Sequence, residues 1–221
     1  MVATVAFGMG INHNKVKAVI HLNMPNTLEQ YYQEAGRAGR DKNMKAKCIL
    51  YYDYSDKILA DLRNSLPGNS TLKILAYCED IFTCRRILIA QHFGETVNIS
   101  QCGICDNCTY NRKSSIKLID FTLQASIVVD FVAALPIYNL TLTLNQLNDA
   151  LRGLSIPKKP EIAKVPGFGT LKTCTLRFLR FLIINQWLED HVKQIGRGIF
   201  GYVAVGPKAK STYSLNFPIE H

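Results

Sequence analysis

Two arginines, Arg37 and Arg40, stand three positions apart in the segment GRAGR at residues 36–40. The small residues around them let the backbone come close to a ligand. During hydrolysis of a nucleoside triphosphate, charge spreads over the γ-phosphoryl oxygens, and a guanidinium group directed at them stabilises the transition state. A helix that ends at Gly36 would also favour arginines beside it, because its C-terminus carries partial negative charge. The segment therefore predicts either a catalytic arginine pair or an ordinary helix end.

Cysteine spacing gives a second chemical signal. Three of the seven cysteines, Cys102, Cys105 and Cys108, occur in the segment CGICDNC. Structural zinc takes four ligands in a tetrahedron, and closely spaced cysteines supply several of them from one turn. Either Cys84 or Cys78 could supply the fourth. Buried small side chains or a redox pair are the alternatives, but this density of thiols favours a closed zinc site that holds structure and does not activate water.

The composition is that of a basic, folded chain. Of its 221 residues 48% are hydrophobic, which is enough to bury a core in two or three compact units. The formal charge of +9, from 26 Lys and Arg against 17 Asp and Glu, favours a polyanionic partner, although a solvated basic surface is equally compatible. Because we recognise neither a secretory signal nor an apolar stretch of membrane-spanning length, we expect a cytosolic or nuclear protein whose clustered thiols bind metal.

Strands and a helix are expected around the arginine segment. Compact β-branched runs at residues 2–7 and 16–22 predict buried strands, and residues 46–54 predict another. Residues 27–37 predict a helix, whose opening Thr-x-x-Gln forms a capping box. This order of elements indicates part of an α/β sheet, with ligand-binding loops at the strand ends.

The rest of the chain is predicted to be mainly helical. A helical pattern runs from residue 55 to about residue 93, with a break at LPGNS (66–70). The segment TYNRKSSIK (109–117) is polar and basic without apolar periodicity, so it predicts a linker. The last part predicts a series of helices and then a hairpin, at residues 121–135, 143–154, 171–188 and 187–209. Helices followed by a two-stranded ribbon are typical of a winged-helix domain.

These patterns divide the chain into an α/β part, a helical zinc-binding part, a linker and an α+β winged-helix domain. The predicted boundaries are, in the same order, residues 1–54, 55–110, 111–117 and 118–221. Cys48 falls within a predicted strand and Cys174 within a predicted helix, and we expect both to be core residues.

Basic residues on the predicted helix at 171–188 could contact a phosphate backbone. Arg177 and Arg180 lie off its apolar face, and Lys172 lies at its start. An ordinary amphipathic core helix explains the same pattern. The three lysines in the preceding loop SIPKKPEIAKVPG could also touch the backbone.

The predicted hairpin tip combines two basic residues with an aromatic ring. Lys193, Arg197 and Phe200 flank a glycine-containing turn. An aromatic side chain beside basic residues can stack on a terminal base pair and hold two strands apart. A merely solvent-exposed turn is the competing interpretation.

Five blocks of the sequence together resemble the RecQ family of ATP-dependent DNA helicases. They stand in the family's order and roughly its spacing: TVAFGMGIN (4–12), VKAVIH (16–21), YYQEAGRAGRD (31–41), CRRILIAQHFGE (84–95) and CGICDNC (102–108). The resemblance is dense over residues 1–108 and looser over 118–221, where YVAVGPKA (202–209) is similar to the second wing strand. It implies an α/β remnant of a RecA-like lobe with helicase motifs V and VI, then a helical zinc platform, then an α+β winged-helix domain.

The resemblance also implies roles for individual residues. It assigns Arg40 as the arginine finger and Arg37 as the companion that couples hydrolysis to movement, and it selects Cys84 over Cys78 as the fourth zinc ligand. Gln33 matches the motif VI glutamine near the nucleotide. The motif V positions near the nucleotide are Gly10 and Asn12, and the one facing the DNA backbone is Thr4. The segment HNK at residues 13–15 departs from the proline-containing stretch common in the family.

A helicase of this kind also needs a Gly-x-x-x-x-Gly-Lys-Ser/Thr phosphate loop and an acidic magnesium box, and the 221 residues contain neither. The Gly-rich segment GFGTLK (167–172) has the wrong spacing. We therefore expect the C-terminal part of a 3′–5′ DNA helicase acting in repair, recombination and replication, inactive by itself.

Its expected partner is forked or partly single-stranded DNA, with one structural Zn²⁺; ATP and Mg²⁺ would bind only to the full-length helicase. The expected location is the nucleus in a eukaryote and the cytoplasm otherwise. A stand-alone zinc-containing winged-helix module that binds DNA without motor activity is the alternative.

Overall fold

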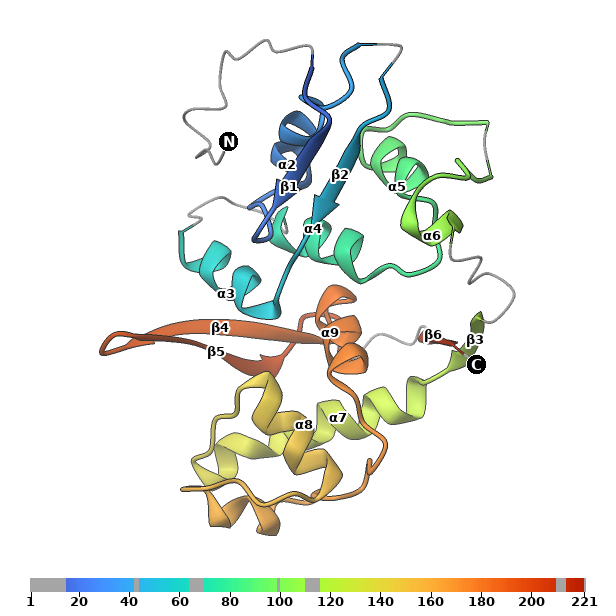
Figure 1. The fold of residues 1–221 in the computed structure, drawn as a ribbon. Helices are drawn as coiled ribbons and strands as arrows, with labels where there is room; N and C mark the ends of the chain where they lie inside the picture. Colours follow the sequence, from blue (N-terminus) through green and yellow to red (C-terminus); the bar gives the residue numbers. More distant parts are fainter. Residues whose placement is uncertain are drawn as a thin grey trace. The chain divides into compact units, whose positions relative to one another are not determined.

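The structure is a computed structural model that describes residues 15–41, 44–63, 70–98, 100–109, 116–209 and 214–220 (Figure 1). Contacts divide the chain into two compact units, the first made of residues 1–78 with 88–97 and the second of residues 79–87 with 98–221. The strand predicted at residues 2–7 lies outside the described residues. The four domain boundaries proposed from the sequence stay predictions.

The first unit begins with a β-α-β arrangement, as the sequence predicts. Strands β1 (Ala18–His21) and β2 (Lys47–Leu50) pair in parallel and lie side by side in Figure 1, and helix α2 (Leu28–Ala35) connects them. The helix starts at Thr27, whose Oγ1 accepts a hydrogen bond from the backbone N–H of Gln30 at 3.1 Å. The reciprocal half of the predicted capping box differs, because the Gln30 side chain accepts from the backbone of Asn26 instead of Thr27.

Three helices follow β2. The sequence predicted only two, because it indicated a single break, at residues 66–70, in the helical pattern from residue 55 to about residue 93. They are α3 (Tyr54–Arg63), α4 (Ser70–Glu79) and α5 (Arg85–His92). The unpredicted break lies at residues 80–84, where Oδ1 of Asp80 accepts hydrogen bonds from the backbone N–H groups of Phe82 and Thr83 at 2.9 and 2.6 Å. An aspartate that caps the next turn in this way competes with a continuous helix.

Cys48 is an exposed residue of β2, so the prediction that it belongs to the core is wrong. In the described part of the chain, β2 pairs only with β1. An apolar run is buried on both faces only when layers cover both faces of its sheet. The core of this unit instead includes Leu28 of α2, Ile58 of α3 and Leu75 of α4.

The second unit contains the cysteine segment, a helical core and two antiparallel strand pairs. Its elements are α6 (Asp106–Thr109), β3 (Ile116–Asp120), α7 (Thr122–Ala134), η2 (Leu135–Tyr138), α8 (Leu144–Arg152), η3 (Pro160–Lys164), α9 (Leu176–Ile184), β4 (Leu188–Ile195), β5 (Gly198–Val205) and β6 (Asn216–Glu220). The three predicted helices correspond to α7, α8 and α9. The predicted hairpin is the β4–β5 pair.

The core of these helices follows their apolar faces. Phe131 of α7, Leu147 of α8 and Leu179 of α9 are fully buried. Helix α8 shows both halves of a capping box at Thr143 and ends at Gly153, whose φ of 81° suits a residue without a Cβ. Helix α8 therefore begins at its capping box and ends at its C-terminal glycine.

The hairpin is joined to the helical core by a short third strand contact. Thr143, the residue before α8, forms an isolated antiparallel bridge with Tyr202 of β5. The backbone N–H of Val203 donates to the carbonyl of Leu142 at 2.9 Å. These contacts fix the base of the hairpin next to the start of α8.

Two features of this unit differ from the predictions. The β3–β6 pair was not predicted, because β3 begins inside the segment read as a linker and its partner lies about 100 residues away. Cys174 is buried, as predicted, but it lies in the turn before α9 and not within the helix. The helix begins only at Leu176 because Thr175 caps it through a hydrogen bond from the Phe178 N–H.

None of the helices in the described part of the chain combines the length and the apolar character that crossing a bilayer requires.

Candidate functional site: a four-cysteine cluster and an arginine segment

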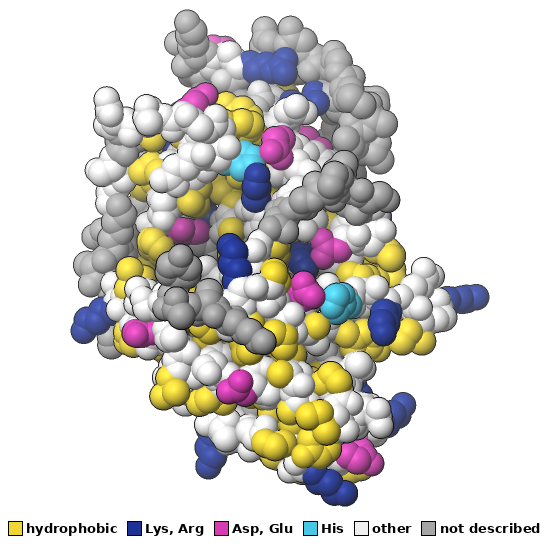
Figure 2. All heavy atoms as spheres, turned by 180° about the vertical axis from the view of Figure 1, so that it is seen from behind, with side chains coloured by type: hydrophobic (Ala, Val, Ile, Leu, Met, Phe, Trp, Pro, Cys, Tyr) yellow, Lys and Arg dark blue, Asp and Glu magenta, His cyan; other side chains and the backbone are white. Residues whose placement is uncertain are grey.

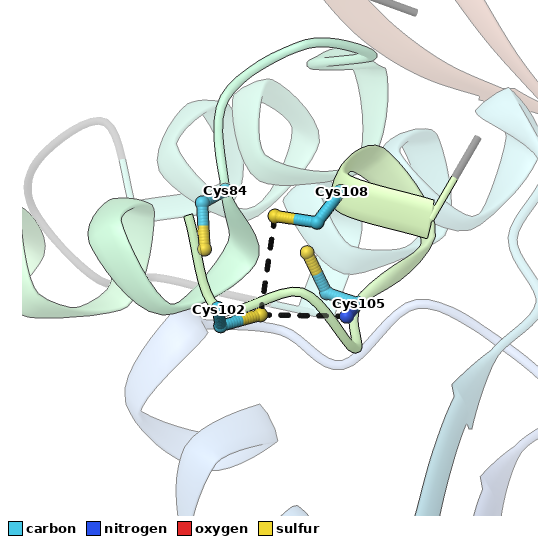
Figure 3. Close-up of side chains that lie close together, drawn as sticks. All are labelled: Cys84, Cys102, Cys105 and Cys108. Atoms are coloured by element: carbon cyan, nitrogen blue, oxygen red, sulfur yellow. Dashed lines mark hydrogen bonds between the residues drawn. The ribbon is translucent and has the colours of Figure 1, made fainter. Parts of the chain in front are cut away.

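Four cysteine side chains converge in the second unit. The sulfur atoms of Cys84, Cys102, Cys105 and Cys108 all lie within 4.8 Å of one another, and those of Cys102 and Cys108 are 4.0 Å apart (Figure 3). Four sulfurs at about 2.3 Å from a tetrahedral zinc ion would be about 3.8 Å apart, so the donor set and its spacing fit zinc. Cys78, the alternative fourth ligand, is not part of the cluster.

Local backbone geometry brings the four thiols together. Cys84 directly precedes α5, and Cys108 lies in α6. Between them, the Cys102–Cys105 turn passes through Gly103 at φ 71°, and the backbone N–H of Cys105 points to the sulfur of Cys102 at 3.4 Å. Such N–H to sulfur contacts stabilise thiolates in metal-binding turns, since they place positive dipoles on the sulfur.

The thiols differ in their tendency to ionise. Burial disfavours the Cys84 thiolate, but the backbone N–H groups of Ile87 and Arg86 at the start of α5 outweigh this effect and lower the pKa of Cys84 to about 7. Burial raises the pKa of Cys105 to about 12. Four adjacent thiolates would repel one another, so complete ionisation of the cluster requires a bound cation that displaces the protons.

Polar residues beside the ligands join the two cysteine segments. Arg85 donates to both carboxylate oxygens of Asp106, with Nε to Oδ1 at 2.9 Å and Nη2 to Oδ2 at 2.8 Å. The buried Asn107 donates from Nδ2 to the carbonyls of Thr83 at 2.8 Å and Asp80 at 3.1 Å. The hydrogen bonds from Arg85 lower the pKa of Asp106 and keep its carboxylate charged.

Sequence reasoning missed these three supporting residues. Arg85 directly follows one ligand, and Asp106 and Asn107 fill the spacer between two others. Residues that hydrogen-bond around a metal site orient its ligands. Their position next to the cysteines in the sequence is the signal that could have identified them.

The arginine segment follows the end of α2. Gly36 caps the helix in the right-handed region and donates to the carbonyl of Tyr32 at 2.9 Å. The left-handed residue is Gly39 at φ 69°, whose N–H donates to the carbonyl of Val16 at 3.1 Å. A Cβ built on Gly39 would lie 3.1 Å from the Cβ of Ala46, so both the conformation and the tight approach favour glycine here.

Of the residues predicted to serve the nucleotide, Gln33, Arg37 and Arg40 lie in and around this segment. Arg40 and Gln33 are exposed, whereas Arg37 is half-buried. Within the described residues, the buried Nε of Arg37 has no hydrogen-bond partner. Gly10 and Asn12, also predicted near the nucleotide, and Thr4, predicted to face the DNA backbone, lie outside the described residues.

The β4–β5 hairpin carries the predicted aromatic and basic side chains near its tip. Its two-residue turn consists of Gly196, at φ 60°, and the exposed Arg197. A glycine with positive φ at the first turn position is typical of a tight hairpin turn. Lys193 and Phe200 pair across the two strands, and Phe200 is 40% exposed.

The basic residues around α9 are arranged differently. The guanidinium of Arg177 donates to the carbonyl of Pro218 at 2.9 Å and lies over the ring of Phe217, 5.0 Å from its centroid. Arg180 forms an ion pair with Glu79. Lys172 is exposed. Both predicted arginines therefore interact with other groups of the protein, whereas Lys172 lies at the surface.

Comparison with known proteins places these features in a family. The family model described as RecQ zinc-binding matches residues 62–109, and the model described as helicase conserved C-terminal domain matches residues 1–42. The chain is 34% identical to the RecQ-like DNA helicase blm-1 of Caenorhabditis elegans, over 90% of its own length. These matches support a RecQ C-terminal region in this chain. The sequence-based recognition of the family is thus confirmed.

Two further relatives support the RecQ assignment along nearly the whole chain. The chain is 35% identical to ATP-dependent DNA helicase Q1 of Pongo abelii over 95% of its length, and 33% identical to ATP-dependent helicase SGS1 of Saccharomyces cerevisiae over 94%. It spans only 23% of blm-1, 32% of Q1 and 16% of SGS1. The zinc-binding family match and the four-cysteine cluster together confirm the predicted structural zinc.

Replacing Cys105 with serine should remove zinc and destabilise the protein. The purified wild-type chain should hold one zinc ion. In the variant, the free energy of unfolding should fall by about 3 kcal/mol, as for loss of a native cross-link. This loss would lower the melting temperature by roughly 6–12 °C. Metal analysis and thermal unfolding measure both. The matched control is Cys48→Ser, an exposed thiol outside the cluster, which should leave zinc content unchanged. A metal-free wild-type protein that melts normally would contradict the site.

Asn107→Ala should weaken zinc binding without changing its stoichiometry. The amide joins the loop before α5 to the cysteine turn, and losing such an outer contact typically lowers metal affinity by about 10- to 100-fold. Competition with a chromogenic chelator measures the affinity. Asn145→Ala, an exposed asparagine on α8, is the control. Equal affinities in the two variants would show that Asn107 plays no part in holding the ligands.

Proposed function

We propose that this chain forms the C-terminal part of an ATP-dependent 3′–5′ DNA helicase of RecQ type, acting in DNA repair, recombination and replication. The observation that carries the proposal is that one chain contains both matches. The helicase C-terminal match includes the arginine segment, and the RecQ zinc-binding match includes the four-cysteine cluster. The names of the relatives agree with it, since two are DNA helicases and the third is an ATP-dependent helicase.

In this proposal the arginine segment serves ATP hydrolysis. Arg40 contacts the γ-phosphate in the transition state, Arg37 couples hydrolysis to movement, and Gln33 lies near the nucleotide. Gly10 and Asn12 contribute from motif V. The exposure of Arg40 and the preference for glycine at position 39 support a loop that can reach a ligand. ATP and Mg²⁺ bind only where a phosphate loop is also present, and the 221 residues hold no such motif.

The zinc site holds structure in this proposal. Cys84, Cys102, Cys105 and Cys108 are its four ligands, and a closed set of four thiolates leaves no open position for catalysis. The metal supplies a cross-link between two segments of the chain.

The remainder of the second unit is proposed to be a winged-helix domain. Three helices, α7, α8 and α9, precede the β4–β5 hairpin, and the Thr143–Tyr202 bridge supplies the short strand contact that such a domain needs beside its wing. Neither family model covers this region, whereas the relatives align through it, since they match 90 to 95% of the chain.

DNA is the proposed partner, as a forked or partly single-stranded duplex. Phe200 would stack on the terminal base pair while Lys193 and Arg197 hold the phosphates, and Lys172 and Thr4 would add backbone contacts. Figure 2 shows one face of the molecule, the side opposite to that seen in Figure 1. Basic side chains are dispersed among acidic ones on it, and some lie at the projecting end near the right edge of the picture. A contact by Arg177 or Arg180 would require each to leave its present partner. Nuclear localisation follows if the protein is eukaryotic, as the relatives are.

DNA binding should depend on the hairpin tip and weaken as salt rises, because phosphate contacts release counterions. Arg197→Ala combined with Phe200→Ala should lower affinity for a forked duplex by roughly 10-fold or more and reduce the preference for the fork over blunt duplex. Fluorescence anisotropy at several salt concentrations measures both. The control is Lys117→Ala, which removes one positive charge from an exposed position on β3, away from the hairpin tip. An unchanged fork preference in the double variant would rule out the strand-separating role.

The chain alone should bind DNA but show no DNA-stimulated ATP hydrolysis. Arg40 can stabilise the γ-phosphate only when a phosphate loop and Mg²⁺ present it, and removing such a finger typically costs about a thousandfold in rate. Adding a phosphate-loop lobe should restore turnover and unwinding, and Arg40→Ala should abolish both. A steady-state ATPase assay with and without single-stranded DNA tests this. DNA binding without restored turnover in the longer protein would favour a binding module over a motor.

A further inference from the structure

Helix α2 determines where the arginine segment points. The helix ends at Ala35, and the backbone N–H groups of Arg37 and Ala38 donate to the carbonyls of Glu34 and Ala35 at 3.2 and 3.1 Å. The Gly39 N–H donates to the carbonyl of Val16 at 3.1 Å. Any pivoting of α2 would therefore be passed on to Arg37 and Arg40.

A histidine–carboxylate pair holds the first turn of α2. Oε1 of Glu29 lies 2.6 Å from Nε2 of His92, the last residue of α5. The His92 side chain is 9% exposed, and 63 residues separate the pair in sequence. This is therefore a tertiary contact between a largely shielded histidine and a carboxylate that is 50% exposed. Water screens such a pair less than it screens a pair with both partners at the surface.

A ring contact reinforces this pair on the same side of α2. Tyr32, one turn after Glu29, packs against Phe93, with ring centroids 5.1 Å apart. Phe93 follows His92 directly, so two consecutive residues at the end of α5 contact two residues one turn apart on α2. The Glu29 carboxylate remains ionised here, because hydrogen bonds from its own backbone N–H and from His92 lower its pKa.

A second histidine holds the last turn of α2. Nε2 of the buried His21, at the end of β1, lies 2.8 Å from Oε2 of Glu34. The other oxygen of Glu34 accepts a hydrogen bond from the Gln30 side chain at 3.1 Å. The helix is thus fixed near its start by α5 and near its end by β1. A helix fixed at two points resists pivoting more than one fixed at a single point.

We propose that Glu29 and His92 are positioning residues that hold the first turn of α2 on α5 and thereby set the direction of Arg37 and Arg40. The inference rests on the proposed role of Arg40 at the γ-phosphate. Neither residue touches the nucleotide in this view. Their effect is geometric, and a misplacement of about 1 Å at a reacting group can cost on the order of 100-fold in rate.

Amide hydrogen exchange in the zinc-loaded chain tests the pair directly. Glu29→Ala and His92→Ala should each speed exchange across residues 28–41 by about five- to tenfold, as expected for loss of a hydrogen bond with a charged partner. The double variant should show no further increase, because both changes remove the same contact. Glu29→Gln keeps an acceptor for the imidazole and should restore slow exchange.

Two controls separate this effect from general destabilisation. Glu189→Ala removes the exposed Glu189–His191 pair on β4 and should leave exchange at residues 28–41 unchanged. Helix α4, residues 70–79, serves as an internal reference that should not respond. Unchanged exchange in the single variants, additive increases in the double variant, or an equal increase at α4 would each overturn the proposal.

A kinetic readout distinguishes this inference from the proposed function. In a longer protein with a phosphate-loop lobe, Glu29→Ala should lower kcat for ATP hydrolysis by about tenfold or more with little change in KM, and Glu29→Gln should recover most of it. If Arg40→Ala leaves hydrolysis unchanged, the proposed function fails while the exchange result stands. If Arg40 matters and Glu29→Ala alters neither exchange nor kcat, the positioning role is wrong.

Discussion

Four sulfur atoms held within 4.8 Å of one another are the constraint on which the cysteine region depends. Such a cluster ionises fully only around a cation, and the ion then joins the segment before α5 to the Cys102–Cys108 turn. Between residues 79 and 109, few described residues are buried, and one of them is the amide Asn107. Metal ligation and polar contacts therefore replace a hydrophobic core here, as in other small metal-bound folds.

Glycine imposes a comparable constraint on the arginine segment. The left-handed turn at Gly39 and the close approach of Ala46 both disfavour a side chain at this position, so backbone geometry constrains the residue that precedes Arg40. The segment GRAGR thus combines two requirements that a surface helix end does not have. A helix that ended at Gly36 for capping alone would not need a second glycine three residues later.

Much of this organisation could be predicted from the sequence, because it depends on local signals. The cysteine spacing gave the zinc site, the apolar periodicity gave α7, α8 and α9, and the tight glycine turn gave the β4–β5 hairpin. Long-range pairing could not be predicted in this way. The β3–β6 pair joins segments about 100 residues apart, and β3 contains polar and apolar residues without a clear strand pattern. Burial also depends on neighbours, so Cys48 in an apolar strand is nonetheless exposed.

Charge was the least specific of the sequence signals, and the structure explains why. A net charge of +9 cannot distinguish a guanidinium that is open to a phosphate from one that a carbonyl and a ring already engage. Arg177 is of the second kind, whereas Arg197 occupies an exposed turn. A phosphate contact at Arg177 must offset the loss of its bond to Pro218, but one at Arg197 displaces mainly water. The hairpin tip is therefore the energetically easier place for this chain to engage a polyanion.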